Sequence, residues 1–206
     1  MIQPLGYLKE SASQTAGPYV HIGLTPNFSG INGVYESDLG ATMVNDKTLG
    51  RRITITGRVL DGTDRPLRDA LIEIWQADAN GLYNSPSELR GSADPDFAGW
   101  GRCATNVETG EYRFETVKPG RVPFKDGRLM APHISFWIVA RGINLGLNTR
   151  LYFGDEEAAN AEDPVLTRIE HRVRVPTLVA MAAADGDKYR FDIRLQGENE
   201  TVFFDI

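Results

Sequence analysis

Residues 131–141 read Ala-Pro-His-Ile-Ser-Phe-Trp-Ile-Val-Ala-Arg, an almost unbroken apolar run rich in β-branched and aromatic side chains. The run is too short to span a membrane and is typical of a central strand that is buried on both faces. Polar residues stand at its two ends, with His133 and Ser135 near the beginning and Arg141 at the end. We therefore expect a buried strand whose ends carry the candidate chemistry.

Short strand-like segments recur from residue 51 onward. Residues 52–59 alternate apolar and polar side chains with period two, which predicts a half-buried strand. Further strands are expected at 70–76, 111–117, 134–140, 149–153, 189–195 and 201–205. The single helix expected lies near 155–161, with Asp155 as its cap. The pattern predicts an all-β fold, an antiparallel β-sandwich, over residues 51–206.

Residues 1–50 have a different character. Proline and glycine are frequent there and interrupt any long helix or strand. We expect an irregular N-terminal arm that packs on a partner subunit. Within the arm, Gly17-Pro18 predicts a turn, after which Tyr19 and His21 project from an extended piece.

Composition excludes several classes of partner. The 206 residues carry a formal net charge of −6, which disfavours nucleic acid or an anionic membrane. No signal peptide is visible, and the single cysteine, Cys103, excludes an internal disulfide framework and suits a reducing compartment. We expect a cytoplasmic protein in which Cys103 is a small, partly buried side chain and not a catalytic thiol.

Catalytic motifs are absent from the pattern. The three histidines, His21, His133 and His171, show no metal-ligand spacing, and a lone histidine near a buried strand is more often structural. No nucleophile elbow, phosphate-binding loop or dinucleotide fingerprint occurs. The pattern alone therefore assigns no function.

Several longer segments together resemble a known family. They are SQTAGPYVHIG (13–23), VLDGTDRPLRDALIEIWQADANGLY (59–83), DPDFAGWGR (94–102), TVKPG (116–120), APHIS (131–135), ARGINLG (140–146), TRLYFGDE (149–156) and YRFDIRLQGENETVFFDI (189–206). The order of these segments resembles the intradiol ring-cleaving dioxygenases over essentially the whole chain. The first and last segments resemble more specifically the α chains of the protocatechuate 3,4-dioxygenases within that family.

The resemblance implies that the family's iron site is dismantled here. The iron-bearing β chains hold Fe(III) with two tyrosines and two histidines, and the matching positions in this sequence are Trp100, Val122, His133 and Ser135. Of these four residues, only His133 is of the type that binds the iron in the β chains. The resemblance therefore implies no metal in this chain, with the Fe(III) cofactor bound by a partner β subunit.

The resemblance also implies how this chain contributes to activity. It would complete the active site of the β subunit, in αβ units of a larger oligomer, with Gly17, Pro18, Tyr19 and Arg141 as substrate-binding residues and no catalytic residue of its own. The implied reaction is intradiol cleavage of 3,4-dihydroxybenzoate by O2 to 3-carboxy-cis,cis-muconate, a step of aromatic degradation in the β-ketoadipate pathway. An arginine suits the substrate carboxylate, and a tyrosine supplies an aromatic wall and a hydroxyl.

Two other hypotheses stay open on the sequence. The chain could be a catalytically silent, transthyretin-like β-sandwich that only binds a ligand or a protein. It could also be an autonomous dioxygenase whose ligands include Tyr112 or Tyr152. Whether Tyr83 reaches the pocket is open as well.

Overall fold

The computed structural model describes residues 14–184 and 186–205. Within them the chain forms nine strands, two short α-helices and two 3₁₀ helices. The strands are β1 Arg52–Leu60, β2 Leu71–Trp75, β3 Trp100–Ala104, β4 Glu111–Val117, β5 His133–Val139, β6 Leu147–Phe153, β7 Val179–Ala182, β8 Lys188–Arg190 and β9 Ile193–Arg194. The helices are α1 Val20–Leu24, α2 Glu157–Glu162, η1 Leu166–Arg168 and η2 Arg172–Leu178.

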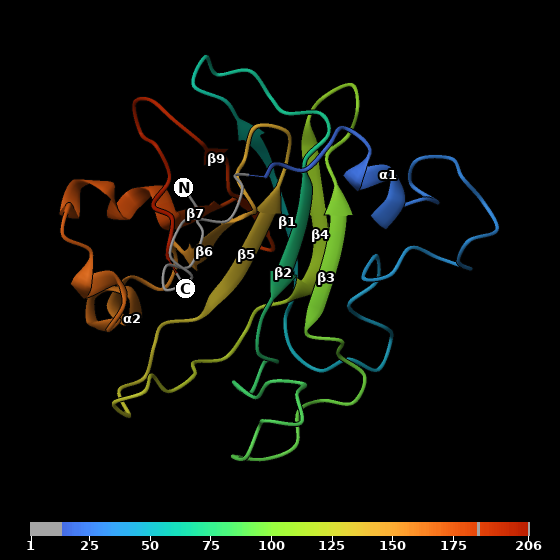
Figure 1. The fold of residues 1–206 in the computed structure, drawn as a ribbon. Helices are drawn as coiled ribbons and strands as arrows, with labels where there is room; N and C mark the ends of the chain where they lie inside the picture. The colour runs from blue at the N-terminus through green and yellow to red at the C-terminus, as the bar shows by residue number, and fades with distance from the viewer. Residues whose placement is uncertain (1–13, 185, 206) are drawn as a thin grey trace, which may run out of the picture.

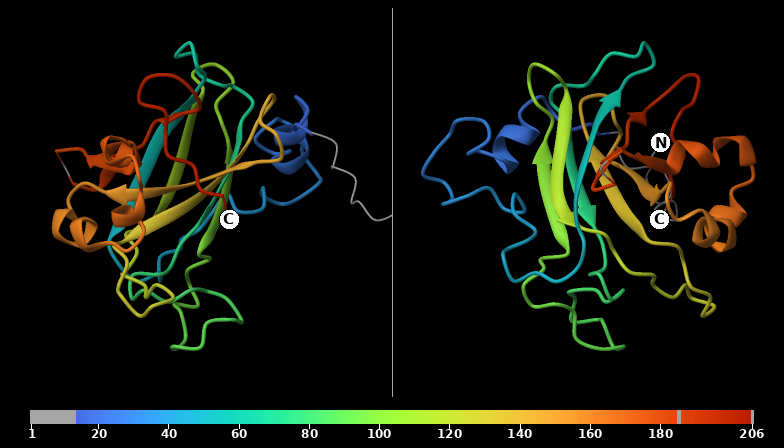
Figure 2. Two further views of the ribbon diagram at one scale, coloured as in Figure 1. Left: turned by 60° about the vertical axis from the view of Figure 1, so that its left-hand side comes forward. Right: turned by 180° about the vertical axis from the view of Figure 1, so that it is seen from behind.

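The strands pair in the order β3-β2-β5-β6-β7-β8-β1-β4, and β9 pairs with β1. The sheet folds over on itself, so that β2, β3, β5 and β6 face β1 and β4 across the core (Figures 1 and 2). The all-β sandwich predicted from the sequence is confirmed. Three of its pairings, β1–β8, β1–β9 and β6–β7, are parallel, which the antiparallel prediction did not include.

Strand β5 explains why the core forms where it does. Its alternate residues Ile134, Phe136 and Ile138 point into the space between the layers and are at most 1% exposed. The other face of the strand is only partly covered, because Ser135 is half-buried and Trp137 is 36% exposed. The prediction that β5 is buried on both faces was therefore wrong for its middle, and the open part of this face belongs to the candidate site.

A glycine in β1 allows a close approach to the neighbouring chain between β8 and β9. A Cβ atom at Gly57 would lie 1.8 Å from the carbonyl oxygen of Phe191 and 2.7 Å from the hydroxyl of Tyr112. Tyr112 donates a hydrogen bond to that same carbonyl from within the core. No side chain fits at position 57, so glycine is required there by space and not by its backbone angles.

Several local predictions from the sequence were wrong. The segment after Tyr19 forms the helix α1 and not an extended piece. Asp155 does not cap α2, whose cap residue is Glu156; it accepts hydrogen bonds from Lys118 Nζ (2.8 Å) and the Tyr189 hydroxyl (2.9 Å).

Strand boundaries also differ from the expectation. The segment 189–195 divides into β8 and β9, whereas 201–205 forms a single bridge, between Phe204 and Asn148. Strands β3 and β7 and both 3₁₀ helices were not predicted.

The N-terminal arm joins the sandwich earlier than expected. The Met43 carbonyl accepts a hydrogen bond from Ala98 N (3.0 Å), and the Gly40 carbonyl accepts one from Arg102 N (2.9 Å). Met43 itself is 3% exposed and belongs to the main core. Residues after about 40 are therefore part of the domain's own packing, and only the earlier part projects as an arm (Figure 1).

None of the helices in the part of the chain that the structure describes has the length and apolar character that a membrane crossing requires.

Candidate functional site at the two ends of β5

The outer face of the β3-β2-β5-β6 layer brings together the residues of the expected metal site. Strand register aligns Trp100, Trp75, Ser135 and Arg150 in one row across the four strands. His133 lies one step along the same face, opposite Tyr152 of β6. The pseudo-site is defined as Trp100, Val122, His133 and Ser135, and three of these residues, Trp100, His133 and Ser135, share one face of the sheet near the beginning of β5.

Two of the four positions carry no metal donor. The indole N–H of Trp100 donates toward Glu73 Oε2 (3.3 Å), and the guanidinium of Arg102 lies 5.0 Å from the indole ring centre. Val122 is 3% exposed and packs in a small apolar cluster with Ala77 and Met130. Hydrogen bonding and apolar packing have replaced the oxygen ligands that the resemblance implies.

His133 is held as a neutral, structural side chain. It is 5% exposed, and its Nδ1–H donates to the Ala131 carbonyl oxygen at 2.8 Å. Burial, together with the positive charge of Arg150, lowers the pKa of His133 to about 4. The imidazole is therefore uncharged near neutral pH and orients the start of β5.

The residues of the pseudo-site do not fit a ferric ion. Fe(III) favours several hard oxygen donors together with imidazole, and this set offers one imidazole, one hydroxyl, an indole and an alkyl group. The charge that acts most strongly on His133 is the cation Arg150, which disfavours a metal cation. Over residues 14–184 and 186–205 no cluster of three or more His, Cys, Asp or Glu side chains forms a possible metal site.

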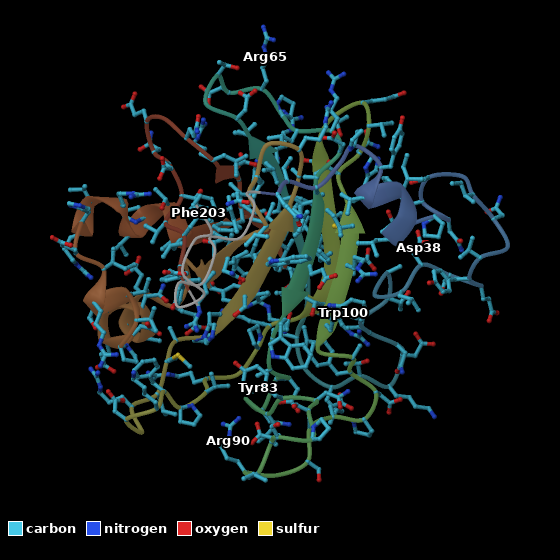
Figure 3. The ribbon with its side chains drawn as sticks, viewed as in Figure 1. Asp38, Arg65, Tyr83, Arg90, Trp100 and Phe203 are labelled. Carbon is cyan, nitrogen blue, oxygen red and sulfur yellow. The ribbon has the colours of Figure 1, made fainter. Side chains whose placement is uncertain are left out.

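The tyrosines left open by the sequence are buried in other roles. Tyr112 lies in the core, where burial raises its pKa far above the ordinary value. Tyr152 is fully buried beside His133, and burial again raises its pKa. Neither is poised to become a phenolate ligand. Tyr83 does reach the pseudo-site region, because it stacks on Trp75 (ring centres 6.0 Å apart) and packs against the cluster containing Val122. Figure 3 shows Tyr83 on the loop that lies below Trp100 in that view.

The remaining cysteine and histidines take no part in this site. Burial raises the pKa of Cys103 to about 12, so its thiol stays protonated, which agrees with the structural role expected for it. His21 is buried on α1 and His171 is exposed before η2, so the three histidines lie on three separate elements.

The exposed cation Arg141 lies just beyond the other end of β5. Strand β5 spans seven residues, about 20 Å, so Arg141 lies far from the pseudo-site. Arg141 Nε forms an ion pair with Asp69, and the arginine side chain is 64% exposed whereas that of Asp69 is 13% exposed. The arginine is thus held by a largely buried carboxylate while most of its side chain stays exposed.

The start of the arm is fixed beside Arg141. Thr15 Oγ1 accepts from Gly142 N (2.7 Å) and donates to the Ala140 carbonyl (3.2 Å), while Leu145 N donates to the Gln14 carbonyl (2.8 Å). The early arm therefore crosses the same end of the molecule as the 140–146 loop (Figure 1).

This anchoring brings the expected substrate-binding residues to one end of the molecule. Gly17 and Pro18 are exposed, and Tyr19 is 75% exposed. The turn that they form follows the Thr15 anchor and leads into α1, with Val20 N bonded to the Gly17 carbonyl (3.3 Å). The structure thus places Gly17, Pro18 and Tyr19 at the end of the molecule that also carries Arg141.

Two important residues were missed from the sequence. Asp163 is fully buried and accepts hydrogen bonds from the amides of Ala131, Val165 and Leu166, each at 2.8 Å. It ties the start of β5 to η1. Arg150 was overlooked because its position beside Ser135 depends on the β5–β6 register, which no local pattern reveals.

Comparisons with known proteins agree with this architecture. A family model described as Dioxygenase matches residues 25–197. The chain is 47% identical over 205 residues to the protocatechuate 3,4-dioxygenase alpha chain of Pseudomonas putida, covering 98% of this chain and all of that one. It is 35% identical over 179 residues to the protocatechuate 3,4-dioxygenase beta chain of Burkholderia cepacia, covering 82% of this chain and 75% of that one.

A solved structure shows the same fold. The dioxygenase domain of a dioxygenase–carbohydrate-binding protein fusion from Streptomyces sp. SirexAA-E superimposes with a TM-score of 0.54 at 25% identity, covering 83% of this chain and 95% of that one. The family match extends over most of the sandwich and includes both ends of β5. The chain therefore belongs to the intradiol ring-cleaving dioxygenase family.

Proposed function

We propose that this chain is the α subunit of a protocatechuate 3,4-dioxygenase and completes the active site of an iron-bearing β subunit. The reaction would be intradiol cleavage of 3,4-dihydroxybenzoate by O2 to 3-carboxy-cis,cis-muconate. Relatives that carry these two chain names, both similar to this sequence, support the pairing. The observation that carries the proposal is the outward-facing group of Tyr19 and Arg141 at one end of a chain whose own pseudo-site does not fit iron.

Arg141 would bind the substrate carboxylate. Its Nε is occupied by Asp69, and among the described residues no other group pairs with the two terminal nitrogens. A guanidinium edge with two N–H groups matches a carboxylate in a bidentate pair. Because Asp69 is largely buried and holds the arginine in place, the pair would orient the ring of the substrate as well as attract it.

Tyr19 would supply a wall of the same site. Tyr19 is 75% exposed among the described residues, and it follows the Gly17-Pro18 turn of the arm. An exposed aromatic ring with a hydroxyl suits contact with a catechol ring and exclusion of water from it. The iron, and the redox chemistry that it supports, would belong to the β subunit.

The arm itself supports the proposed partnership. Beyond Tyr19 it exposes a series of large apolar side chains, namely Phe28, Ile31, Val34, Tyr35 and Leu39, each between 42% and 56% exposed. Apolar side chains grouped on one projecting segment mark protein interfaces. We assign this surface, residues 19–39, to contact with the β subunit.

The two alternative hypotheses receive less support. A transthyretin-like binding module would not explain the match to dioxygenase chains along the whole sequence. An autonomous dioxygenase would need oxygen ligands at the pseudo-site, and Tyr112 and Tyr152 are buried with raised pKa values.

Purification of this chain alone and of its co-expressed complex with a β-type chain tests the proposal. We expect the complex to contain iron and to consume O2 when 3,4-dihydroxybenzoate is added. We expect the isolated chain to contain no iron and to show no turnover. Ferric–tyrosinate visible absorption in the isolated chain would overturn the assignment. So would full turnover by the β-type chain without this one.

A further inference from the structure

A cavity of about 510 Å³ lies on the outer face of β5 and β6, beside the pseudo-site. Its floor includes Ser135 and Arg150, and its walls include Phe124, Val165, Ile169 and Phe204. The 155–178 segment and the C-terminal segment approach each other over this flank of the sandwich (Figures 1 and 2). A volume of this size is typical of sites for small organic ligands.

Among the described residues, no carboxylate neutralises the positive charge of Arg150 in the lining of the cavity. Arg150 is half-buried, and its partners are all uncharged: the Tyr152 hydroxyl, the sulfur of Met130 (3.5 Å) and the ring of Phe204 (5.9 Å from its centre). A thioether is a weak acceptor, and no described carboxylate lies within ion-pair distance of this guanidinium. A half-buried cation in apolar surroundings gains much from an anionic partner.

The other cations of the cavity already have partners. Arg174 pairs with Glu200 at 2.8 Å, and Arg168 lies 3.5 Å from Asp126 and stacks on Phe124. The exposed Glu170 belongs to the rim, where solvent screens its charge. A cation in the cavity lining that has no carboxylate partner among the described residues, with apolar side chains around it, favours a ligand with one negative charge and an apolar body.

We propose that this cavity binds a small carboxylic acid with an apolar body, its carboxylate on Arg150 and Ser135 and its body against the apolar walls. The fork of the guanidinium suits a carboxylate, and the Ser135 hydroxyl, paired in register with Arg150, can donate a further hydrogen bond. The inference concerns binding alone, and no cluster of metal-binding side chains lies among the described residues. The inference goes beyond the proposed function, since it assigns this chain a ligand site of its own.

Calorimetric titration of the assembled protein with three probes tests the proposal. The probes are benzoate, cyclohexanecarboxylate and benzamide, which separate the need for an aromatic ring from the need for charge. We expect both acids to bind and the neutral benzamide to bind at least about tenfold more weakly, because only the acids pair with Arg150. The visible absorption of the iron, recorded in parallel, reports binding at the metal independently.

Three variants make the result decisive. Arg150→Met removes the charge but keeps an extended apolar side chain, and we expect loss of the benzoate site with an unchanged iron spectrum. Ile169→Trp, which fills part of the cavity and keeps the Arg150 side chain, should have the same effect. Arg113→Met, at an exposed ion pair on β4, is the matched control and should bind benzoate as the parent does.

Two outcomes would overturn the inference. One is benzoate binding that both Arg150→Met and Ile169→Trp leave intact. The other is benzoate binding that always changes the iron spectrum and never exceeds one site per iron. Neither outcome bears on Arg141, so failure of this inference is distinguishable from failure of the proposed function.

Discussion

Arg141 and Asp69 form an ion pair in which the carboxylate is largely buried and the guanidinium largely exposed. The buried partner limits the motion of the arginine, whereas the exposed edge of the guanidinium stays accessible. An arginine that served only the stability of this chain would gain little from such an arrangement, because exposed ion pairs contribute little to folding. The arrangement suits an arginine that is positioned for a ligand.

Replacement of Arg141 by alanine should therefore affect turnover more than folding. We expect kcat/KM for 3,4-dihydroxybenzoate to fall roughly 10- to 150-fold, the equivalent of about 1.5–3 kcal/mol for a charged hydrogen bond. Steady-state O2 uptake by the complex measures the loss, with iron content unchanged. Arg113→Ala is the control, since Arg113 is 58% exposed in an ion pair with Glu115 (2.7 Å). Equal kinetics in the two variants would refute the role of Arg141.

Asp69→Asn tests whether the arginine is positioned as well as present. The amide keeps the size of the carboxylate but removes the charge that anchors Arg141 Nε. We expect KM to rise with a smaller change in kcat, because substrate binding weakens while the reacting atoms stay with the β subunit. A variant whose KM equals that of the parent would show that Arg141 needs no anchor.

Gly17→Ala tests whether glycine is needed at this position for the folding of this chain or for close packing against substrate and the β subunit. A Cβ atom at Gly17 would meet nothing within 4 Å among the described atoms, so the melting temperature of the chain should not change. If substrate and β subunit pack closely against the Gly17-Pro18 turn, kcat/KM should fall at least about fivefold, the lower limit of overpacking costs. Gly23→Ala, also without neighbours and within α1, is the control. Equal kinetics in both variants would place the turn outside the active site.

Much of the fold could be predicted because alternation and apolar runs are local. The periods of β1, β4 and β5 are visible in residues 52–59, 111–117 and 134–140, and their bounds agree closely with the structure. The helix α1 could not be predicted in the same way, since five residues that include Gly23 have no helical period to detect. Its turn is fixed instead by contacts such as Gly23 N to the Tyr19 carbonyl (3.0 Å).

The candidate site was predictable only as far as the family resemblance reached. The resemblance identified the pseudo-site positions and Arg141 residue by residue. It did not identify Asp69, Asp163 or Arg150, because each acts through a partner distant in sequence. Arg150 meets Ser135 across the β5–β6 pair, and Asp163 reaches Ala131 across 32 positions. Such pairings depend on register and loop packing, which only the folded chain defines.

The close approach at Gly57 predicts a large stability effect. Gly57→Ala should destabilise the protein by about 3 kcal/mol, because the added methyl would overlap the Phe191 carbonyl and displace the Tyr112 hydroxyl. Urea denaturation followed by tryptophan fluorescence measures the change. Gly17→Ala, which adds the same methyl group in open space, should not shift the midpoint. A Gly57→Ala midpoint equal to that of the parent would show that the backbone around Phe191 can move away from β1 without cost.

The low pKa of His133 predicts that the free energy of unfolding decreases as the pH falls below neutral. Its pKa is about 4 in the folded protein against an ordinary value of 6.5, so below pH 6.5 the unfolded chain binds a proton that the folded chain does not. The contribution of His133 is therefore absent above pH 6.5 and increasingly destabilising as the pH falls toward 4. Its full size is roughly 3 kcal/mol, from about 1.4 kcal/mol per pH unit.

The variant His133→Asn isolates this contribution, because the amide N–H can replace the Nδ1–H bond to the Ala131 carbonyl without titrating. We expect lower stability than the parent at pH 7.5, from the smaller side chain, but a shallower loss between pH 6.5 and 4.5. Thermal unfolding midpoints across this range measure both slopes. His171→Asn, at an exposed histidine, should follow the parent profile. If His133→Asn also loses stability as steeply as the parent, the acid sensitivity must come from groups other than this imidazole.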